Sequence, residues 1–394
     1  MSARVALVTY SNKPRGGVVH TLALAEALCA LGYEPTVVAL ADLAAEDGFY
    51  RHTVVPYALI QAPAWAPSLE ERVFASVEAL TEGLVHLRGE FDILHTQDCI
   101  SARAAVAVKR AGAGVAVLRT VHHVDDFTTP ALVNCQTRAI LEPDRLLVVS
   151  EHWRQLLHRD YGVGATVVHN GVDPSCFPPI TPQSRAAMRA GVGAGDRFVF
   201  LTVGGIEPRK GSVHLLEALG RLKARLSPPP LLVVVGGHSF QDYTAYREGA
   251  LSRLPEWGLE LGKDVVVLGT VPQNELAGWY RAADALAFPS LKEGWGLVTL
   301  EALAADLPVI ATDIAVFQEY LANEENALLV PAADPERLAL GMARLVTDKG
   351  LRSRLRRGGQ QVVGRFPWRD TAVRHLGVYE ELVEMLNPSQ TTGQ

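Results

Sequence analysis

The decisive stretch of this chain is Glu293-Gly-Trp-Gly-Leu-Val-Thr-Leu-Glu301, which continues into Ala302-Leu-Ala-Ala-Asp-Leu-Pro-Val-Ile-Ala311. Two carboxylates with seven residues between them flank a glycine turn, and a buried-strand pattern follows. Gly294 and Gly296 would let backbone N–H groups at the start of a helix approach a ligand. We therefore expect Glu293 on the loop and Glu301 in the second helical turn, both facing one elongated, hydroxyl-rich ligand. The alternative is that Glu293 only complements the dipole of the helix and that Glu301 is solvated on the helix surface.

Length and composition limit the protein class. The 394 residues suffice for two domains, and 48% apolar with 20% charged residues is an ordinary globular composition. The net charge of −6 gives no general attraction to nucleic acid or to an anionic membrane. No apolar run approaches the roughly 18 residues that span a bilayer. The N-terminus lacks a signal-peptide layout, so we expect a cytoplasmic protein.

Metal and redox motifs are missing from the sequence. The four cysteines form no C-x-x-C pair, and neither H-E-x-x-H nor a D-x-D arrangement occurs. We therefore expect reduced thiols, no metal site and no cofactor.

Short apolar strands alternate with helical patterns in two series. This alternation predicts βαβ units around two parallel sheets, an α/β protein with two Rossmann-like domains. Ligands of such sheets bind beyond the carboxyl ends of the strands. A proline-rich segment from Pro174 to Pro182 is expected to link the domains, and an amphipathic helix is expected at 366–386. The predicted strands are 5–9, 34–40, 93–95, 116–121 and 146–150, then 198–203, 231–235, 265–268, 285–289 and 308–311.

A basic loop follows the strand at 198–203. It reads Gly204-Gly205-Ile-Glu-Pro-Arg209-Lys210-Gly-Ser, and its cations and backbone N–H groups suit a diphosphate. The Gly-Lys-Ser order of an NTPase loop is absent. The alternative is two solvated cations beside a tight turn.

The first series contributes candidates of its own. Gly16 and Gly17 precede the helix expected at 20–31. They could let an anion approach the N-terminus of that helix, or they could simply make the loop flexible. His122 and His123 follow the strand at 116–121 and could bind a substrate oxygen, shuttle a proton near pH 7, or serve structure alone. Asp125 and Asp126 are candidate acceptors for hydroxyl groups or helix caps.

Together these segments resemble the retaining family-four glycosyltransferases, which have the GT-B fold of two Rossmann-like domains facing a cleft. Glu293 and Glu301, with Pro308, match the family's E-x7-E signature. The likeness extends over nearly the full chain, through Val149-Ser-Glu151, Asn170-Gly-Val-Asp173 with Phe177, Lys210-Gly211, Gly269-x-Val271, Tyr280-x-x-Ala-Asp284 and Pro289-Ser290.

The resemblance implies an acceptor-binding domain at 1–175, joined by the C-terminal helix at 372–394, and a sugar-nucleotide-binding domain at 184–371. Glu301 would bind the ribose, Glu293 the donor sugar, and Lys210 with Arg209 the diphosphate. His122 would lie by the donor sugar and the acceptor, with His123, Asp125 and Asp126 on the acceptor side. Further donor contacts would come from Gly16, Gly17, Gly204, Gly205, Val271, Gly294, Trp295, Gly296 and Leu297.

The implied reaction moves a hexosyl group from a UDP, GDP or ADP sugar to a small-molecule or glycan acceptor. It retains the anomeric configuration and needs no metal. Other possibilities are an epimerase or phosphorylase of the same fold, or a non-catalytic sugar-nucleotide-binding protein. The acidic residues between Ser68 and Glu90 do not favour membrane docking, although the apolar segment 57–67 could touch lipid, a partner subunit or an acceptor.

Two positions depart from the family pattern. Many relatives have Arg directly after the first loop glycine, where this chain has Gly205, and Arg209 could replace that cation. Asp306 stands where the family usually has glycine before Leu-Pro, a change that should alter the helix end more than the chemistry.

Overall fold

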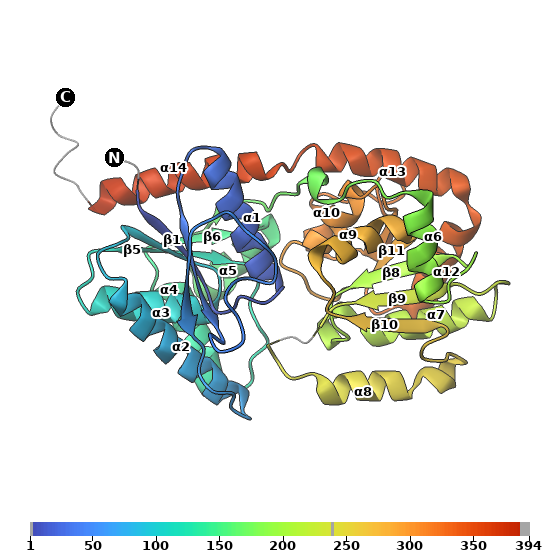
Figure 1. Ribbon diagram of the computed structural model, residues 1–394, viewed down its shortest axis with the longest axis horizontal. Coiled ribbons are helices and arrows are strands. Elements are labelled where there is room, and N and C mark those ends of the chain that lie inside the picture. The colour runs from blue at the N-terminus through green and yellow to red at the C-terminus, as the bar shows by residue number, and fades with distance from the viewer. Residues whose placement is uncertain (1–2, 238–239, 387–394) are drawn as a thin grey trace. The chain divides into compact units, whose positions relative to one another are not determined.

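A computed structural model describes residues 3–237 and 240–386 (Figure 1). The chain divides into two compact units. Unit 1 contains the residues up to Gly171 together with those from Trp368 onward, and unit 2 runs from Val172 to Pro367. Both units have a parallel sheet covered by helices, which confirms the predicted α/β class with two Rossmann-like domains.

The sheet of unit 1 has the strand order β3-β2-β1-β4-β5-β6-β7 among the described residues. The order reverses beside β1, which pairs with both β2 and β4. Loops that leave β1 and β4 therefore diverge at one point of the carboxyl edge, where α/β sheets bind ligands. The strands are β1 Val5–Thr9, β2 Thr36–Ala41, β3 Tyr57–Gln61, β4 Ile93–Thr96, β5 Ala116–Val121, β6 Arg145–Val148 and β7 Thr166–Val167.

The helices of unit 1 cover both faces of this sheet because its central strands are buried throughout. The last helix returns from the end of the chain to pack on α1, as Figure 1 shows in red and blue. There Tyr379 Oη lies 2.9 Å from His95 Nδ1 in β4. The helices are α1 Gly16–Ala30, α2 Leu69–His86, α3 Cys99–Arg110, α4 Pro130–Leu141, α5 Glu151–Tyr161 and α14 Trp368–Leu386.

The sheet of unit 2 has the order β10-β9-β8-β11-β12-β13 within the described part of the chain. Its reversal lies at β8, which pairs with β9 and β11. The strands are β8 Val199–Val203, β9 Leu231–Val235, β10 Val265–Gly269, β11 Ala285–Phe288, β12 Val309–Thr312 and β13 Leu328–Val330. The longer helices are α6 Pro182–Gly191, α7 Ser212–Lys223, α8 Thr244–Ser252, α9 Gln273–Ala282, α10 Leu297–Ala304, α12 Pro335–Thr347 and α13 Lys349–Val363, and short helical turns are η1 Pro174–Cys176, η2 Pro208–Lys210, η3 Leu254–Trp257 and α11 Ala315–Gln318.

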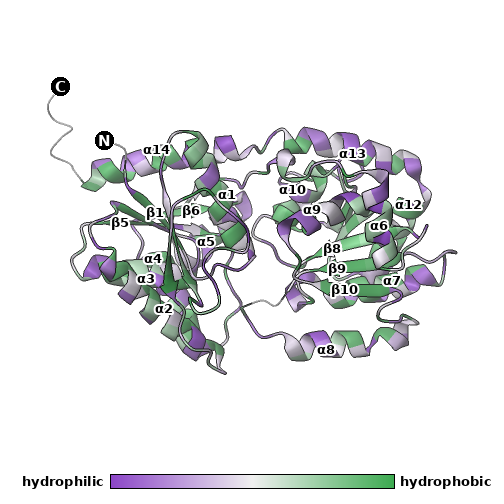
Figure 2. Cartoon of the chain, viewed as in Figure 1, coloured by the Kyte–Doolittle hydropathy of each residue, from purple (hydrophilic) through white to green (hydrophobic). Residues whose placement is uncertain are grey.

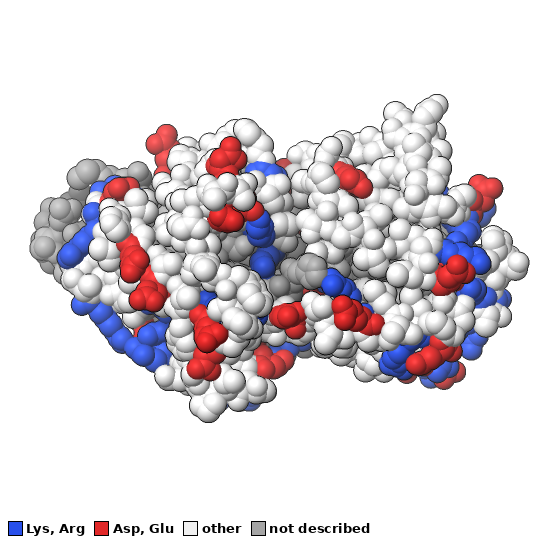
Figure 3. Space-filling view, turned by 60° about the horizontal axis from the view of Figure 1, so that its bottom comes forward, with Lys and Arg blue, Asp and Glu red and all other residues white. Residues whose placement is uncertain are grey.

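Side-chain polarity follows this architecture. In Figure 2 the strands are almost uniformly hydrophobic, whereas the helices carry both hydrophobic and hydrophilic residues. Basic and acidic side chains are interspersed on the face drawn in Figure 3. This mixture agrees with the small net charge of −6.

Three strands and one connection differ from the sequence-based expectation. The strands β3, β7 and β13 were not predicted, because β7 and β13 have only two and three residues and β3 is half-exposed. The proline-rich segment is packed against α9 and is no free linker. Phe177 is buried against the ring of Tyr280, and its carbonyl accepts a 2.9 Å hydrogen bond from Arg281 Nε.

Candidate active site

The candidate site in unit 2 lies where its strand order reverses. The loop after β8 carries Arg209 and Lys210, and the loop after the adjacent strand β11 carries Glu293. Because β8 and β11 pair in parallel, their carboxyl ends lie side by side. The topology thus brings together two segments about 80 residues apart at the position where α/β sheets bind ligands.

Glu293 and Lys210 form a buried ion pair. The Lys210 Nζ lies 2.5 Å from Glu293 Oε1, and the side chains are 15% and 8% exposed. The same oxygen accepts hydrogen bonds from Ser290 Oγ at 2.8 Å and from Arg209 NH1 at 3.3 Å. Glu293 is therefore on the loop, as predicted, but its carboxylate is enclosed by three donors.

These donors decide the charge of Glu293. Burial alone would raise the pKa of Glu293, but the positive charges of Lys210 and Arg209 and the hydrogen bonds from Lys210 and Ser290 outweigh it. The pKa of Glu293 therefore lies below its ordinary value, and the carboxylate is ionised at neutral pH. Lys210 and Arg209 both contact Glu293, and Arg209 NH2 also lies 3.6 Å from Oε2 of the buried Glu207, so two cations and two acids meet at this site.

Two features fix the basic loop in this position. Gly211 has a φ of +65°, and a Cβ there would lie 2.1 Å from the carbonyl oxygen of Pro289. Only glycine lets η2 approach the end of β11 this closely. The ammonium group of Lys210 also lies 4.6 Å from the centroid of the Phe288 ring, a cation–π contact.

Glu301 lies in the second turn of α10, as predicted, and a tyrosine orients it. Tyr280 Oη donates a 2.6 Å hydrogen bond to Glu301 Oε2. Burial raises the pKa of Glu301, while the bond from Tyr280 partly opposes the rise. Tyr280 belongs to the motif Tyr280-x-x-Ala-Asp284, but the spacing of that motif gives no sign of its side-chain contact with Glu301.

Glycines form a surface without side chains at the ends of β8 and β9. A Cβ at Gly236 would lie 2.5 Å from the backbone of Gly204, and one at Gly205 would lie 2.7 Å from the carbonyl oxygen of Gly237. Gly204 and Gly236 both have positive φ. Gly236 and Gly237 were missed in the sequence, although a glycine pair directly after a buried strand is the same signal that selected Gly204 and Gly205.

The other predicted donor-site residues have different environments. Gly296 is the N-cap of α10 with φ +88° and no side-chain cap, so the helix begins with its backbone N–H groups uncapped by a side chain. Leu297 is its first residue, and Gly294 lies in the preceding loop. Trp295 is only 2% exposed and packs on Tyr320 and Phe366, so its side chain belongs to the core of unit 2. Val271 is half-buried beyond β10.

Unit 1 brings three predicted residues together at its own strand reversal. Gly16 and Gly17 are the first residues of α1, where they were expected in the preceding loop. A Cβ at Gly17 would lie 4.0 Å from His122 Cδ2. His122 Nε2 lies 3.1 Å from Oε1 of the buried Gln97, which follows β4. An amide oxygen only accepts, so Nε2 carries the proton and Nδ1 presents a lone pair.

Burial determines the charge state of His122. It lowers the pKa of His122 to about 3, aided by the charges of His123 and Arg119. The ring is therefore neutral at pH 7, and a proton shuttle near neutral pH, one of the possibilities considered above, does not fit. A hydrogen-bonding role for His122 does.

The acceptor-side candidates lie on the segment that follows. His123 Nε2 lies 3.4 Å from Asp125 Oδ1, and the backbone of Asp125 is held by two hydrogen bonds with Gln136. Asp126 is exposed. Neither aspartate caps α4, whose N-cap is Thr129. The capping alternative is therefore wrong for both residues.

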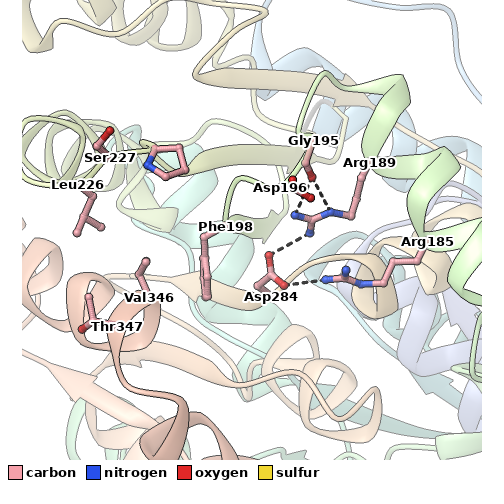
Figure 4. Close-up of a pocket in the computed structure, with 11 residues that line it drawn as sticks. Arg185, Arg189, Gly195, Asp196, Phe198, Leu226, Ser227, Asp284, Val346 and Thr347 are labelled. Atoms are coloured by element: carbon pink, nitrogen blue, oxygen red, sulfur yellow. Dashed lines mark hydrogen bonds and ion pairs between the residues drawn. The ribbon is translucent and has the colours of Figure 1, made fainter.

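A cavity of about 510 Å³ lies elsewhere in unit 2 (Figure 4). It is at the amino ends of β8 and β11, with Phe198 and Asp284 directly before them. Asp284 pairs with Arg185 at 2.7 Å and with Arg189 at 3.0 Å, so these charges already satisfy one another. The cavity is opposite the carboxyl edge and does not belong to the candidate site.

Two kinds of feature are not found within residues 3–237 and 240–386. These residues contain no group of three or more His, Cys, Asp or Glu side chains placed to hold a metal ion. None of their helices is both long and apolar enough to cross a membrane.

Comparison with known proteins identifies the family. Residues 14–175 match the model described as Glycosyltransferase Family 4, and residues 184–362 match Glycosyl transferases group 1. The chain is 31% identical over 321 residues to D-inositol 3-phosphate glycosyltransferase 1 of Catenulispora acidiphila, covering 77% of this chain and 75% of the relative. The chain is a family-four glycosyltransferase. The D-inositol 3-phosphate glycosyltransferase of Streptomyces bingchenggensis is 32% identical to it and covers 79% of this chain and 72% of its own.

Solved structures confirm the GT-B fold of this glycosyltransferase. Sucrose-phosphate synthase from Thermosynechococcus elongatus superposes with a TM-score of 0.80 at 23% identity, covering 97% of this chain and 100% of its own. Anabaena HepE in complex with UDP and glucose has a TM-score of 0.77 at 18% identity, covering 96% and 100%.

Proposed function

We propose that this glycosyltransferase moves a hexosyl group from a nucleotide-diphosphate sugar to a hydroxylated acceptor, with retention at the anomeric carbon and without a metal ion. We assign donor binding to unit 2 and acceptor binding to unit 1. The observation that carries the proposal is the buried pair of Lys210 and Glu293, beside Arg209 and at the start of α10.

Each residue then has a chemical task. Lys210 and Arg209 would stabilise the negative charge that develops on the leaving diphosphate, helped by the N–H groups at the start of α10. Arg209 is 34% exposed and close enough to Glu293 to act beside Lys210, which supports its role as the second phosphate cation in place of Gly205. Glu293 would bind hydroxyls of the sugar, and Glu301, oriented by Tyr280, those of the ribose.

The leaving phosphate would take the acceptor proton on the face from which it departs. The C1–O bond to the diphosphate breaks as the acceptor oxygen bonds to C1 on the same face. The charge on the leaving group is then met by the two cations, so no divalent metal is needed. The neutral His122 would accept a hydrogen bond from the sugar or the acceptor through Nδ1.

The test is transfer from UDP, GDP and ADP sugars to a panel of acceptors, with the product examined by proton NMR. The proposal expects the donor's anomeric configuration in the product and an unchanged rate in EDTA. Inversion would refute retention, and loss of activity in EDTA with recovery in Mg²⁺ or Mn²⁺ would refute metal independence.

A parallel incubation with donor alone separates the alternatives. An epimerase would convert the donor sugar without an acceptor, and a phosphorylase would require inorganic phosphate. A non-catalytic binding protein would shift its melting temperature with the donor but neither hydrolyse nor transfer it.

A further inference from the structure

The buried phenol of Tyr320 contacts the turn that begins α10. Tyr320 follows the short helix α11, is only 3% exposed, and donates a 2.7 Å hydrogen bond from its Oη to the carbonyl oxygen of Trp295. Its ring also packs on the ring of Trp295, with 4.7 Å between the centroids. Burial raises the pKa of Tyr320 above its ordinary value, so the phenol is protonated at neutral pH and can donate. No step of the proposed reaction uses this hydroxyl group.

Thr299 holds the next peptide group of the same turn. Its Oγ1 donates a 2.7 Å hydrogen bond to the carbonyl oxygen of Gly296 and lies 2.6 Å from Tyr320 Oη. The backbone N–H of Thr299 donates to the same carbonyl oxygen at 2.9 Å. Thr299 is fully buried, so both hydroxyl groups lie in the interior of unit 2. Together they fix two consecutive carbonyl groups of the turn.

The direction of these carbonyl groups decides where the N–H groups point. A peptide group is planar, and in its trans form the C=O and N–H bonds point in opposite directions. Both peptide bonds of the turn are trans, since the one cis bond among the described residues lies elsewhere. Because the Trp295 carbonyl points to Tyr320, the N–H of Gly296 points away from Tyr320. Because the Gly296 carbonyl points to Thr299, the N–H of Leu297 points out of the N-terminal end of α10.

These N–H groups are available to a ligand. In the described part of the chain, the N–H groups of Gly296, Leu297 and Val298 have no hydrogen-bond acceptor. Gly296 is buried, and a buried N–H is costly unless a ligand or a water molecule supplies an oxygen. A side chain cannot take its place, because a Cβ at Gly296 would lie 2.4 Å from Phe317 Cε1 and 3.0 Å from Tyr320 Oη. Uncapped N–H groups at a helix start suit a phosphate.

The hydroxyl group of Tyr320 controls the orientation of this turn. We propose that Tyr320 is a positioning residue of the donor site: its hydroxyl keeps the N–H groups of Gly296 and Leu297 directed at a phosphate of the sugar nucleotide. Without the hydroxyl, the Trp295 carbonyl loses its bond from Tyr320, and a peptide group next to a glycine can then turn. This inference rests on the proposed function, because it takes the start of α10 as part of the donor site.

The test compares the wild type with Tyr320→Phe, which removes the hydroxyl group and keeps the ring. Binding of UDP, GDP and ADP is measured by calorimetry, and transfer from UDP-glucose, GDP-mannose and ADP-glucose gives kcat and the donor KM. Tyr379→Phe is the matched control, because Tyr379 is fully buried and its Oη lies 2.9 Å from His95 Nδ1, but in unit 1. Urea unfolding of all three proteins records any general loss of stability.

For the nucleoside diphosphate that binds most tightly, Tyr320→Phe should bind about five- to thirtyfold more weakly than the wild type. Its kcat should fall about ten- to a hundredfold, more than the donor KM rises, because the N–H groups meet negative charge that grows as the diphosphate leaves. Tyr379→Phe should lose a similar amount of stability but keep the affinity and the kcat of the wild type.

An unchanged affinity of Tyr320→Phe for the nucleoside diphosphate, or an equal loss of affinity in Tyr379→Phe, would overturn the inference. Hydrogen exchange in the wild type tests it without a variant. Amide exchange in a peptide that contains residues 294–299 should slow when the nucleoside diphosphate is saturating, and unchanged exchange would overturn the inference even if Tyr320→Phe does not fold.

The same measurements separate this inference from the proposed function. If none of the nucleoside diphosphates binds the wild type and no sugar is transferred, both fail together. If the wild type binds and transfers, and Tyr320→Phe does so equally well, only the role of Tyr320 fails.

Discussion

Replacing Lys210 with methionine should separate two roles of the Lys210–Glu293 pair. The change leaves the Glu293 carboxylate 8% exposed without its 2.5 Å partner. Breaking a buried ion pair from one side costs about 3–5 kcal/mol. Because Arg209 and Ser290 still contact Glu293, we expect about 2–3 kcal/mol of lost unfolding free energy.

The double variant Lys210→Met/Glu293→Gln should recover much of that stability, because no buried charge is left without a partner. Its transferase activity should stay at least about a hundredfold below the wild type, since the cation that meets the leaving diphosphate is gone. Urea unfolding and initial transfer rates measure the two effects on the same protein samples.

Lys223→Met is the matched control. Lys223 Nζ lies 2.7 Å from Oδ2 of Asp264, which is 2% exposed and keeps a second contact with Arg197. This pair is in the same unit but next to the amino end of β10. We expect a similar loss of stability and unchanged transfer. Equal loss of activity in both lysine variants, or full activity in Lys210→Met, would show that Lys210 has no special role in transfer.

Three further changes test other parts of the account. Tyr280→Phe removes the 2.6 Å hydrogen bond that lowers the pKa of Glu301, so Glu301 should become protonated at higher pH. The KM for the donor should then rise about five- to tenfold at pH 7 and further as the pH falls, with kcat changed less. A KM that does not depend on pH would contradict this. Asp306 has a φ of +57° directly after the C-cap of α10, a conformation that glycine adopts without strain. Asp306→Gly should therefore raise the free energy of unfolding by about 0.5–1 kcal/mol without altering transfer. Asp306→Ala should give no such gain in stability. Burial lowers the pKa of His375 to about 4 from an ordinary value near 6.5. Between these two values the unfolded chain binds a proton on His375 that the folded chain does not bind, so a fall in pH favours unfolding. The stability that the neutral His375 contributes is therefore complete above pH 6.5 and is lost as the pH falls towards 4. The wild type should therefore lose about 2–3 kcal/mol more than His375→Leu between pH 7.5 and 4.5 in urea unfolding; parallel pH profiles would contradict this assignment.

The strands of both sheets followed from sequence because parallel strands buried on both faces read as short apolar runs. Val5–Thr9, Ala116–Val121 and Leu231–Val235 have the predicted bounds. The half-exposed edge strand β3 and the very short β7 and β13 carry too few buried residues for that signal. The placement of Glu301 in the second turn of a helix followed from Gly296, whose φ of +88° suits a helix start without a side-chain cap.

The contacts of the site could not be predicted in the same way. Spacing along the chain indicated neither that Lys210 and Arg209 converge on one oxygen of Glu293 nor that Tyr280 holds Glu301, because both depend on pairing between distant segments. Trp295 was assigned to the ligand through its motif, yet its side chain lies in an aromatic cluster of the core. Its position between two glycines gave no indication of which way the ring would turn.

We assign the donor to the Lys210–Glu293 pair. Calorimetric titration of UDP-glucose, GDP-mannose and ADP-glucose into the wild type, Lys210→Met/Glu293→Gln and Lys223→Met measures this role without relying on transfer. At least one sugar nucleotide should bind the wild type and Lys223→Met alike and bind the double variant at least about tenfold more weakly. Equal affinity in all three proteins, or no binding of any sugar nucleotide to the wild type, would contradict it.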